Sequence, residues 1–183
     1  MRRFFLVGYM GAGKTTLGKI VAKEAGLSFI DLDIYIENRY HKTIPDIFRE
    51  KGEAGFRQLE REALQEVADF EDVIIATGGG VPCFFDNAAF MNQKGVTIYL
   101  LTDPEILFNR LKIARHNRPV IKEKSDDELR RFIVENLQKR EAYYRQASLV
   151  FDANQLDTRD QLQAAAEKLV SMMNAVSDKK AER

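Results

Sequence analysis

Eight consecutive residues near the start of the chain restrict its fold more than any other part of the sequence. Residues 8–15 read Gly-Tyr-Met-Gly-Ala-Gly-Lys-Thr, which has the spacing G-x-x-x-x-G-K-[ST] of a phosphate-binding loop. An apolar run at residues 4–7 precedes this loop, and Leu17, Ile20 and Val21 mark one face of a helix after it. Because such a loop joins a buried strand to the N-terminus of a helix, the sequence predicts an α/β fold built around this unit.

The loop residues also predict how a nucleotide is held. Gly8, Gly11 and Gly13 allow the backbone to curl so that its N–H groups point at phosphate oxygens. Lys14 is expected to reach the β- and γ-phosphates, and the Thr15 hydroxyl is expected to join the ligand shell of Mg²⁺. A glycine-rich turn formed by chance is the alternative, and the flanking strand and helix disfavour it.

Short apolar runs recur along the chain and alternate with helical patterns. The runs are continuous rather than alternating, as expected for parallel strands that are covered on both faces. This rhythm predicts a five-stranded parallel sheet within a single domain that spans residues 1–183. The expected strands are residues 4–7, 29–30, 73–77, 97–101 and 149–151.

Composition narrows the classes of function. Lys plus Arg equals Asp plus Glu at 28 each, so no overall charge favours nucleic acid or an anionic membrane. Cys83 is the single cysteine, which excludes an internal disulfide and fits a reducing cytoplasm. With only His41 and His116 besides, a His/Cys metal cluster is not expected. The four apolar residues after the first three are too few for a signal peptide or a membrane span.

Two stretches fit the strand–helix rhythm poorly. About forty mostly helical residues separate Asp31 from Val73, and we interpret residues 33–61 within them as an inserted substrate-binding segment. Residues 112–124 are basic, contain Pro119 and show little apolar patterning, and we interpret them as a mobile lid.

Two aspartates follow the second predicted strand. If Asp31 and Asp33 lie in an extended segment, they project to the same side, at the sheet edge where α/β folds bind ligands. One carboxylate would hold a metal-bound water and the other would orient an acceptor hydroxyl. The alternative is a polar strand end that caps the next helix. Many P-loop proteins have a metal-binding aspartate at the end of such a strand, but this chain has Thr77 there. Asp103, which precedes a proline, fits a helix N-cap better. Asp31 is therefore the favoured metal ligand.

Glycines and arginines supply the remaining signals. The run at residues 78–80 is Gly-Gly-Gly, which predicts close approach by a ligand, with a purely structural tight turn as the alternative. Arg57 lies in the inserted segment, Arg118 in the predicted lid and Arg140 near the end of the following helix. Guanidinium groups suit bidentate binding of carboxylate or phosphate, although a single arginine is more often a solvated surface residue.

The combined pattern resembles the shikimate kinase family from about residue 4 to residue 151. Its order and spacing are far more specific than the phosphate-binding loop alone. The matching features are the loop at 8–15, Asp31 and Asp33, Ile44-x-x-Ile47-Phe48, Gly52-Glu53-x-x-Phe56-Arg57-x-x-Glu60, the glycines at 78–80, Arg118-Pro119, and Arg140 near Tyr144.

This resemblance implies a three-layer α/β/α P-loop kinase fold and a cytoplasmic, monomeric enzyme. The family transfers the γ-phosphoryl group of ATP, with Mg²⁺, to the 3-hydroxyl of shikimate, a step of chorismate and aromatic amino-acid biosynthesis. By the same resemblance, Arg110 would stack on adenine and Arg118 would close over the phosphates. The nucleotide-binding residues are Gly11, Ala12, Gly13, Lys14, Thr15, Thr16, Arg110 and Arg118.

The resemblance also assigns the acceptor and metal residues. Asp33 would hold the acceptor hydroxyl, with Lys14 and Arg118 as the other catalytic residues. Arg57 and Arg140 would clamp the shikimate carboxylate, and Gly79 would contact the substrate ring through its backbone. Asp31 and Thr15 would support Mg²⁺.

One departure from the family pattern concerns the end of a helix. The family usually reads Arg-x-Pro-Leu-Tyr where this chain has Arg140-Glu141-Ala142-Tyr143-Tyr144, so the helix end that aims Arg140 differs.

Three rival functions remain open at this point. Another small-molecule kinase, acting on gluconate or a nucleoside monophosphate, would share the loop. A GTP-dependent switch is disfavoured, because the chain has no Asn/Thr-Lys-x-Asp element for reading guanine. A non-catalytic binding module is disfavoured by the joint presence of Lys14, Asp33 and Arg118.

Overall fold

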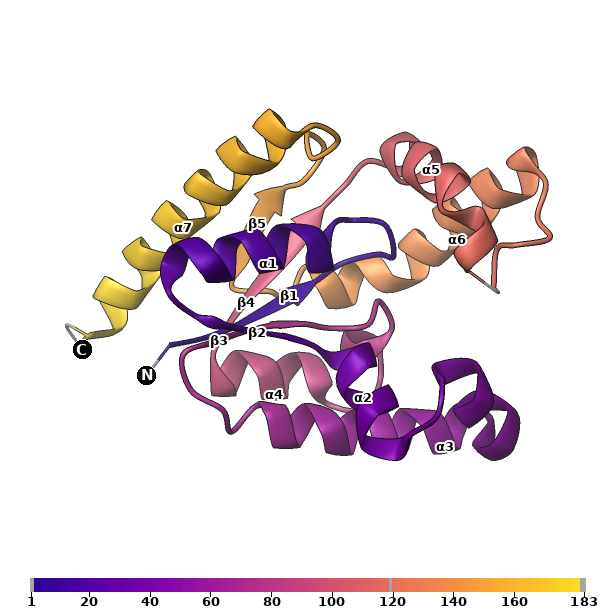
Figure 1. Cartoon of the computed structure of the whole chain (residues 1–183), viewed down its shortest axis with the longest axis horizontal. Helices are drawn as coiled ribbons and strands as arrows, with labels where there is room; N and C mark the ends of the chain where they lie inside the picture. Colours follow the sequence, from indigo (N-terminus) through magenta and orange to yellow (C-terminus); the bar gives the residue numbers. More distant parts are fainter. Residues whose placement is uncertain (1, 119, 182–183) are drawn as a thin grey trace.

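A computed structural model describes residues 2–118 and 120–181, and Pro119 of the predicted lid lies outside them. The described residues form one five-stranded, all-parallel sheet, as predicted, and its strand order is β2-β3-β1-β4-β5 (Figure 1). The strands are β1 Arg3–Val7, β2 Ser28–Asp31, β3 Val73–Ala76, β4 Val96–Leu101 and β5 Leu149–Asp152.

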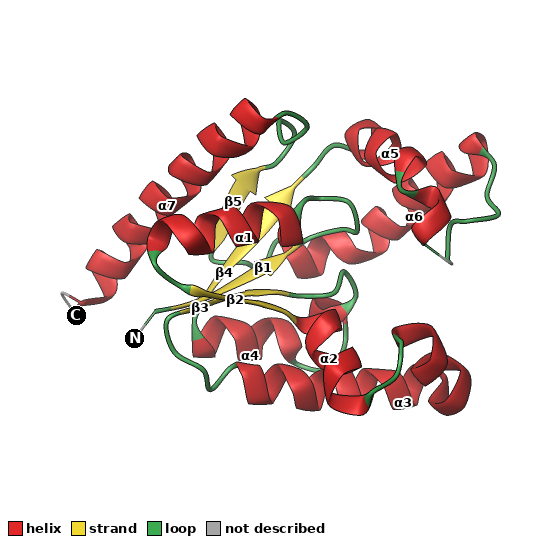
Figure 2. Cartoon of the chain, in the orientation of Figure 1, coloured by secondary structure: helices red, strands yellow, loops and turns green. Residues whose placement is uncertain are grey.

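Helices cover both faces of this sheet, which gives the three layers expected of the fold. Helices α1 and α7 pack together on one side, and α3 and α4 lie on the other (Figure 2). The helices are α1 Lys14–Ala25, α2 Leu32–Tyr40, α3 Ile44–Val67, α4 Asn87–Lys94, α5 Pro104–Ile113, α6 Asp126–Tyr144 and α7 Arg159–Ala181, with 3-10 turns η1 Val81–Cys83 and η2 Arg115–Asn117.

The strand order places the phosphate-binding loop at the centre of the sheet. Strand β1 pairs with β3 on one side and β4 on the other, with Phe4 aligned to both Ile74 and Val96. The residues of β3 are all buried, as the continuous apolar runs predicted. The chain fills one side of β1 before it crosses to the other, and open α/β sheets bind ligands at this kind of switch point.

Capping residues define the ends of two helices. Gly26 ends α1 in the left-handed conformation, with φ of 64°. Ser125 and Glu128 form the reciprocal capping box that starts α6. Asp103 occupies the N-cap position of α5 before Pro104, but among the described residues its side chain makes no capping hydrogen bond.

The two irregular stretches have distinct structures. Residues 33–61 comprise most of α2 and the first part of α3, and α3 bends sharply at Gly52. Residues 112–124 comprise the end of α5, the turn η2 and a series of turns that leads to α6. Among the described helices, none is both long and apolar enough to cross a membrane.

Candidate active site

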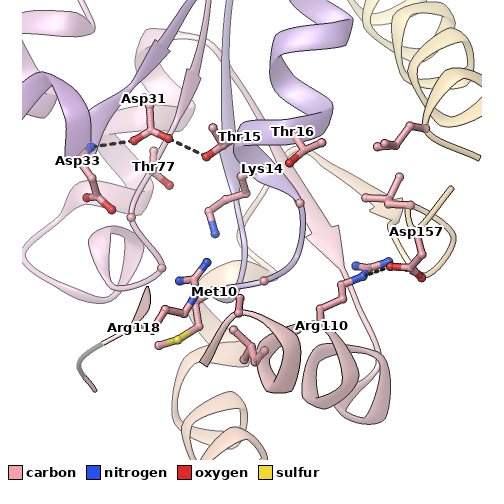
Figure 3. Close-up of a pocket in the computed structure, with 18 residues that line it drawn as sticks. Met10, Lys14, Thr15, Thr16, Asp31, Asp33, Thr77, Arg110, Arg118 and Asp157 are labelled. Carbon is pink, nitrogen blue, oxygen red and sulfur yellow. Dashed lines mark hydrogen bonds and ion pairs between the residues drawn. The ribbon is translucent and has the colours of Figure 1, made fainter. Parts of the chain in front are cut away.

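A cavity of about 330 Å³ opens at the carboxyl ends of the central strands (Figure 3). Its wall is made by the phosphate-binding loop, the end of β2, the glycine loop (residues 78–80), α5, the predicted lid and residues 156–157. Lys14, Asp33 and Arg118 point into the same space from three different segments. The predicted site residues on this wall are Gly11, Gly13, Lys14, Thr15, Thr16, Asp31, Asp33, Gly79, Arg110 and Arg118.

The phosphate-binding loop has the backbone geometry that its glycines predict. Gly8, Gly11 and Gly13 all have positive φ angles, of 141°, 82° and 98°. A Cβ atom on Gly13 would lie 2.7 Å from a methyl carbon of Leu156, so a side chain at this position would also displace Leu156. Ala12 is fully buried and does not line the cavity, in contrast to Gly11 and Gly13 on either side of it.

The Lys14 ammonium is held at the centre of the loop. Its Nζ donates hydrogen bonds to the carbonyl oxygens of Gly8, at 2.7 Å, and Tyr9, at 2.9 Å. Burial lowers the pKa of Lys14 to about 8, although the charge of Asp33 opposes that change. The cation is therefore poorly solvated, and an anionic phosphate at this point would stabilise it.

Asp31 connects β2, α1 and α2. Its Oδ2 accepts a hydrogen bond of 2.6 Å from the Thr15 hydroxyl, and its Oδ1 accepts from the backbone N–H groups of Asp33 and Ile34. The extended geometry expected for residues 31–33 is therefore wrong: β2 ends at Asp31, and Asp33 lies in the first turn of α2. The capping alternative is correct for Asp31, and both carboxylates still line the cavity.

The Asp33 carboxylate lies in a poorly solvated position. Burial raises its pKa above the ordinary value, and the nearby negative charge of Asp31 raises it further, whereas Lys14 acts in the opposite direction. A carboxylate in this environment binds a proton more readily than one in water, which suits a group that receives a proton from a hydroxyl.

The glycine loop makes room for charged side chains. A Cβ atom on Gly78 would lie 3.0 Å from Asp33 Oδ1, and one on Gly79 would lie 3.5 Å from Arg140 Nη1. A Cβ atom on Gly80 would lie only 2.8 Å from both terminal nitrogens of Arg57. The loop also forms a turn, with Val81 N–H bonded to the Gly78 carbonyl at 3.1 Å. The turn interpretation of the three glycines is therefore confirmed, and close approach by a ligand stays a prediction.

Arg57 is held rigidly beside this loop. Its Nη1 donates a 2.7 Å hydrogen bond to Glu60 Oε2, and its guanidinium lies 4.2 Å from the centre of the Phe84 ring. The Arg57 side chain is 12% exposed and Glu60 is 2% exposed. Burial raises the pKa of Glu60 to about 7 even though Arg57 lowers it, so desolvation outweighs the ion pair.

Glu60 has no role predicted from the sequence, although it contacts Arg57 beside the glycine loop. A carboxylate three residues after an arginine in a helix was the available signal, because such side chains are neighbours on the helix surface. Asp157 on the cavity wall was missed as well, and it lies in a loop without any sequence pattern.

Arg140 lies on α6 at the other side of the glycine loop. Its guanidinium carbon is 5.6 Å from the centre of the Tyr9 ring. Helix α6 continues through Ala142 to Tyr144, so the absence of the family's proline leaves Arg140 inside the last turns of a regular helix. Arg57 and Arg140 thus flank the glycine loop from two helices that are distant in the sequence.

Arg110 and Arg118 occupy the nucleotide side of the cavity. Arg110 Nε donates to Asp157 Oδ1 at 2.7 Å, and its Nη2 donates to the carbonyl oxygens of Ala153 and Asn154 at 3.0 Å each. Arg118 reaches the cavity from the predicted lid, where burial lowers its pKa and the charge of Asp33 opposes that change.

These features together define a P-loop kinase of small molecules: a central phosphate-binding loop, a carboxylate beside it and two arginines around a glycine loop. The family model for shikimate kinase matches residues 10–174. This chain belongs to the shikimate kinase family.

Individual relatives agree with that assignment. The chain is 53% identical to the shikimate kinase of Bacteroides fragilis, over 95% of this chain and 97% of the relative. It is 56% identical to that of Parabacteroides distasonis, over 94% of this chain and the whole relative.

Solved structures show the same fold. The shikimate kinase of Bacteroides thetaiotaomicron superposes with a TM-score of 0.92 at 52% identity, over 94% of this chain and 98% of that one. The shikimate kinase of Acinetobacter baumannii in complex with shikimate superposes with a TM-score of 0.79 at 35% identity, over 93% of this chain and 94% of that one.

Proposed function

We propose that this chain transfers the γ-phosphoryl group of ATP to the 3-hydroxyl of shikimate, which gives shikimate 3-phosphate and ADP. The observation that carries the proposal is the convergence of two kinds of site around one cavity. Lys14 and Thr15 lie at the phosphate-binding loop, and Asp33 lies between that loop and the glycine loop. Family membership then supports shikimate as the acceptor, and the Acinetobacter relative is in complex with shikimate.

On the donor side, the protein supplies positive charge and backbone donors. Backbone N–H groups of residues 11–16 and the Lys14 ammonium would bind the phosphates, and Arg110 would face the adenine. Arg118 would add charge at the γ-phosphate when the lid residues lie over the nucleotide. Phosphoryl transfer needs positioning and charge neutralisation more than covalent catalysis, and these groups meet that need.

Thr15 and Asp31 would hold Mg²⁺ together with the phosphates. Their side chains present a hydroxyl and a carboxylate oxygen 2.6 Å apart at the cavity wall. These are hard oxygen ligands, and Mg²⁺ is usually bound by one or two such groups plus waters and phosphates, so the described residues fit this ion. When bound, Mg²⁺ neutralises charge on the phosphates.

On the acceptor side, Asp33 would orient the 3-hydroxyl and accept its proton during the transfer. Arg57 and Arg140 would bind the shikimate carboxylate from opposite sides of the glycine loop. Gly79 would contact the ring through its backbone. Because Glu60 and Phe84 already hold Arg57, the guanidinium loses little freedom when a carboxylate binds.

An acceptor comparison tests this function. ADP release is measured with MgATP alone and with shikimate, gluconate or AMP added in turn. We expect shikimate to accelerate ADP release by at least about a hundredfold, because positioning and proton transfer both require the correct acceptor. If gluconate or AMP accelerates ADP release while shikimate does not, the proposed acceptor is wrong.

We also propose that the enzyme acts as a monomer in the cytoplasm. The phosphate-binding loop, Asp33 and the glycine loop, which the proposed reaction requires, all lie in one chain, and Cys83 is the single cysteine. Light scattering coupled to gel filtration tests the monomer, with an expected mass of 21.0 kDa.

A further inference from the structure

A buried tyrosine connects α6 to the glycine loop, and the proposed reaction does not use its hydroxyl. Tyr144 is the last residue of α6 and is fully buried. Its hydroxyl donates a 2.6 Å hydrogen bond to the carbonyl oxygen of Gly79, a residue 65 positions away in the sequence. We propose that Tyr144 is a positioning residue. Its hydroxyl fixes the Gly79–Gly80 peptide and thereby the part of the glycine loop that would contact the phosphoryl acceptor.

The glycine loop needs a restraint from outside. Three consecutive glycines have wide backbone freedom, and the local hydrogen bonds, from Val81 N–H to Gly78 and from Cys83 N–H to Gly80, leave the carbonyl of Gly79 unrestrained. Among the described residues, none accepts a hydrogen bond from the N–H groups of Gly79 or Gly80. Gly79 lines the cavity, so its N–H is available to a ligand there, whereas Gly80 is buried against Arg57. The direction of the Gly79 N–H depends on how the loop is held.

A hydrogen bond to the Gly79 carbonyl controls that direction. The peptide group is planar, so fixing the carbonyl oxygen of Gly79 fixes the whole Gly79–Gly80 peptide and limits the rotation of Gly79, which lines the cavity. The other side of the loop rests against the phosphate-binding loop, since a Cβ on Gly79 would lie 3.4 Å from Met10 N and 3.5 Å from Gly8 O. Tyr144 thus holds the peptide against the donor site.

The same helix carries one arginine of the acceptor site. Arg140 precedes Tyr144 by four residues, so both side chains lie on one face of α6. The hydroxyl of Tyr144 therefore ties the helix that presents Arg140 to the loop that presents Gly79. Burial raises the pKa of Tyr144, which keeps the hydroxyl protonated as a donor, although the charge of Arg140 acts in the opposite direction.

A neighbouring tyrosine provides a matched control. The Tyr99 ring centre lies 5.2 Å from that of Tyr144, and both residues are buried. The Tyr99 hydroxyl also donates a short hydrogen bond, of 2.7 Å, but its acceptor is Glu141 and not the glycine loop. Removal of either hydroxyl therefore has a similar effect on packing, and only one of them affects Gly79.

The test compares Tyr144→Phe with Tyr99→Phe in steady-state kinetics, and it rests on the proposed function. Phenylalanine keeps the ring and removes only the hydroxyl, so the fold is expected to persist. We expect Tyr144→Phe to raise the KM for shikimate about five- to tenfold, as the loss of one hydrogen bond to a positioned group predicts. The KM for ATP should stay within about twofold in both variants, and Tyr99→Phe should leave the KM for shikimate within about twofold.

Hydrogen exchange adds a readout that does not depend on turnover. Amides of residues 78–80 should exchange faster in Tyr144→Phe than in Tyr99→Phe when no ligand is bound. Equal changes in the two variants, or an unchanged KM for shikimate in Tyr144→Phe, overturn the positioning role. If the wild-type chain releases no ADP in response to shikimate, the proposed function fails instead, and the role of Tyr144 fails with it.

Discussion

Around the cavity, burial changes the pKa of single charged residues more than their charged neighbours do. Glu60 contacts Arg57 at 2.7 Å, yet its pKa rises to about 7. Lys14 has carboxylates near it, yet its pKa falls to about 8. In both cases the loss of solvation outweighs the attraction of the partner. The empty site is therefore costly to the fold, and an anionic phosphate beside Lys14 would reduce that cost.

The raised pKa of Glu60 predicts a pH-dependent change in stability. The folded chain holds a proton on Glu60 up to about pH 7, and the unfolded chain loses it near pH 4.5. Because the folded state binds more protons between these values, the contribution of Glu60 to stability falls as pH rises from 4.5 to 7, by up to about 3 kcal/mol. We expect Glu60→Gln to gain stability relative to wild type over this range.

Urea denaturation at pH 5 and pH 7.5 measures that gain. Glu62→Gln is the matched control, because Glu62 is an exposed residue of the same helix. A difference between Glu60→Gln and wild type that is the same at both pH values contradicts the burial argument.

Substitution of Asp33 should lower turnover without weakening nucleotide binding. Asp33→Asn keeps the size of the side chain and removes the proton acceptor. We expect kcat with shikimate to fall about a hundredfold to ten-thousandfold, the usual contribution of a positioned acid or base, while MgADP affinity changes little. Steady-state kinetics and calorimetric titration with MgADP measure the two effects. An unchanged kcat removes Asp33 from the mechanism.

At the scale of elements, continuous apolar runs predicted each strand to within two residues, because parallel strands are buried on both faces. Capping residues mark where α1 ends and α6 begins. The backbone at Asp33 was predicted wrongly, because Asp31 can continue a strand or cap a helix. Two N–H groups that hydrogen-bond to its carboxylate favour the helix. That choice depends on contacts that local sequence patterns do not reveal.

The bend in α3 is a second element-scale feature that the sequence did not predict. Gly52 has φ of 67° and ψ of −178°, a backbone conformation that is essentially restricted to glycine. The helix continues beyond this bend to Phe56, Arg57 and Glu60, so the bend sets the direction from which Arg57 approaches the glycine loop.

Gly52→Ala tests the cost of that backbone conformation. A Cβ atom at this position meets nothing within 4 Å, so any loss of stability comes from the backbone alone. We expect the free energy of unfolding to fall by about 1–3 kcal/mol, as measured in urea. Lys51→Ala, at the exposed neighbouring position, should change it by less than about 0.5 kcal/mol. Equal effects of the two substitutions contradict the backbone argument.

At the scale of the whole molecule, the site depends on contacts between segments that are far apart in the chain. Its residues come from positions 8–15, 31–33, 57–60, 78–80, 110–118 and 140–157. Sequence motifs predicted most of the charged side chains that face the cavity, because the chemistry of phosphate and carboxylate binding restricts which residue types can serve there. The supporting residues Glu60, Tyr144 and Asp157 act through long-range packing, and their local sequence carries little information about it.

This arrangement predicts that shikimate and MgADP each stabilise the fold, and that each does so through different side chains. Ligand at about a hundred times its Kd adds about 2.7 kcal/mol, which raises the Tm of a chain of this size by about 5–11 °C. We expect shikimate and MgADP each to produce such a shift in thermal unfolding. Addition of EDTA should reduce the shift from ADP, because Thr15 and Asp31 are proposed to hold Mg²⁺ with the phosphates.

Two substitutions should remove the shifts independently. Lys14→Met should abolish the shift from MgADP and retain the shift from shikimate, because Lys14 lies in the phosphate-binding loop. Arg57→Ala should abolish the shift from shikimate and retain the shift from MgADP, because Arg57 flanks the glycine loop. Each variant serves as the folding control for the other. Loss of both shifts in either variant would show that donor and acceptor groups do not act separately, and it would contradict the division of the cavity into two sites.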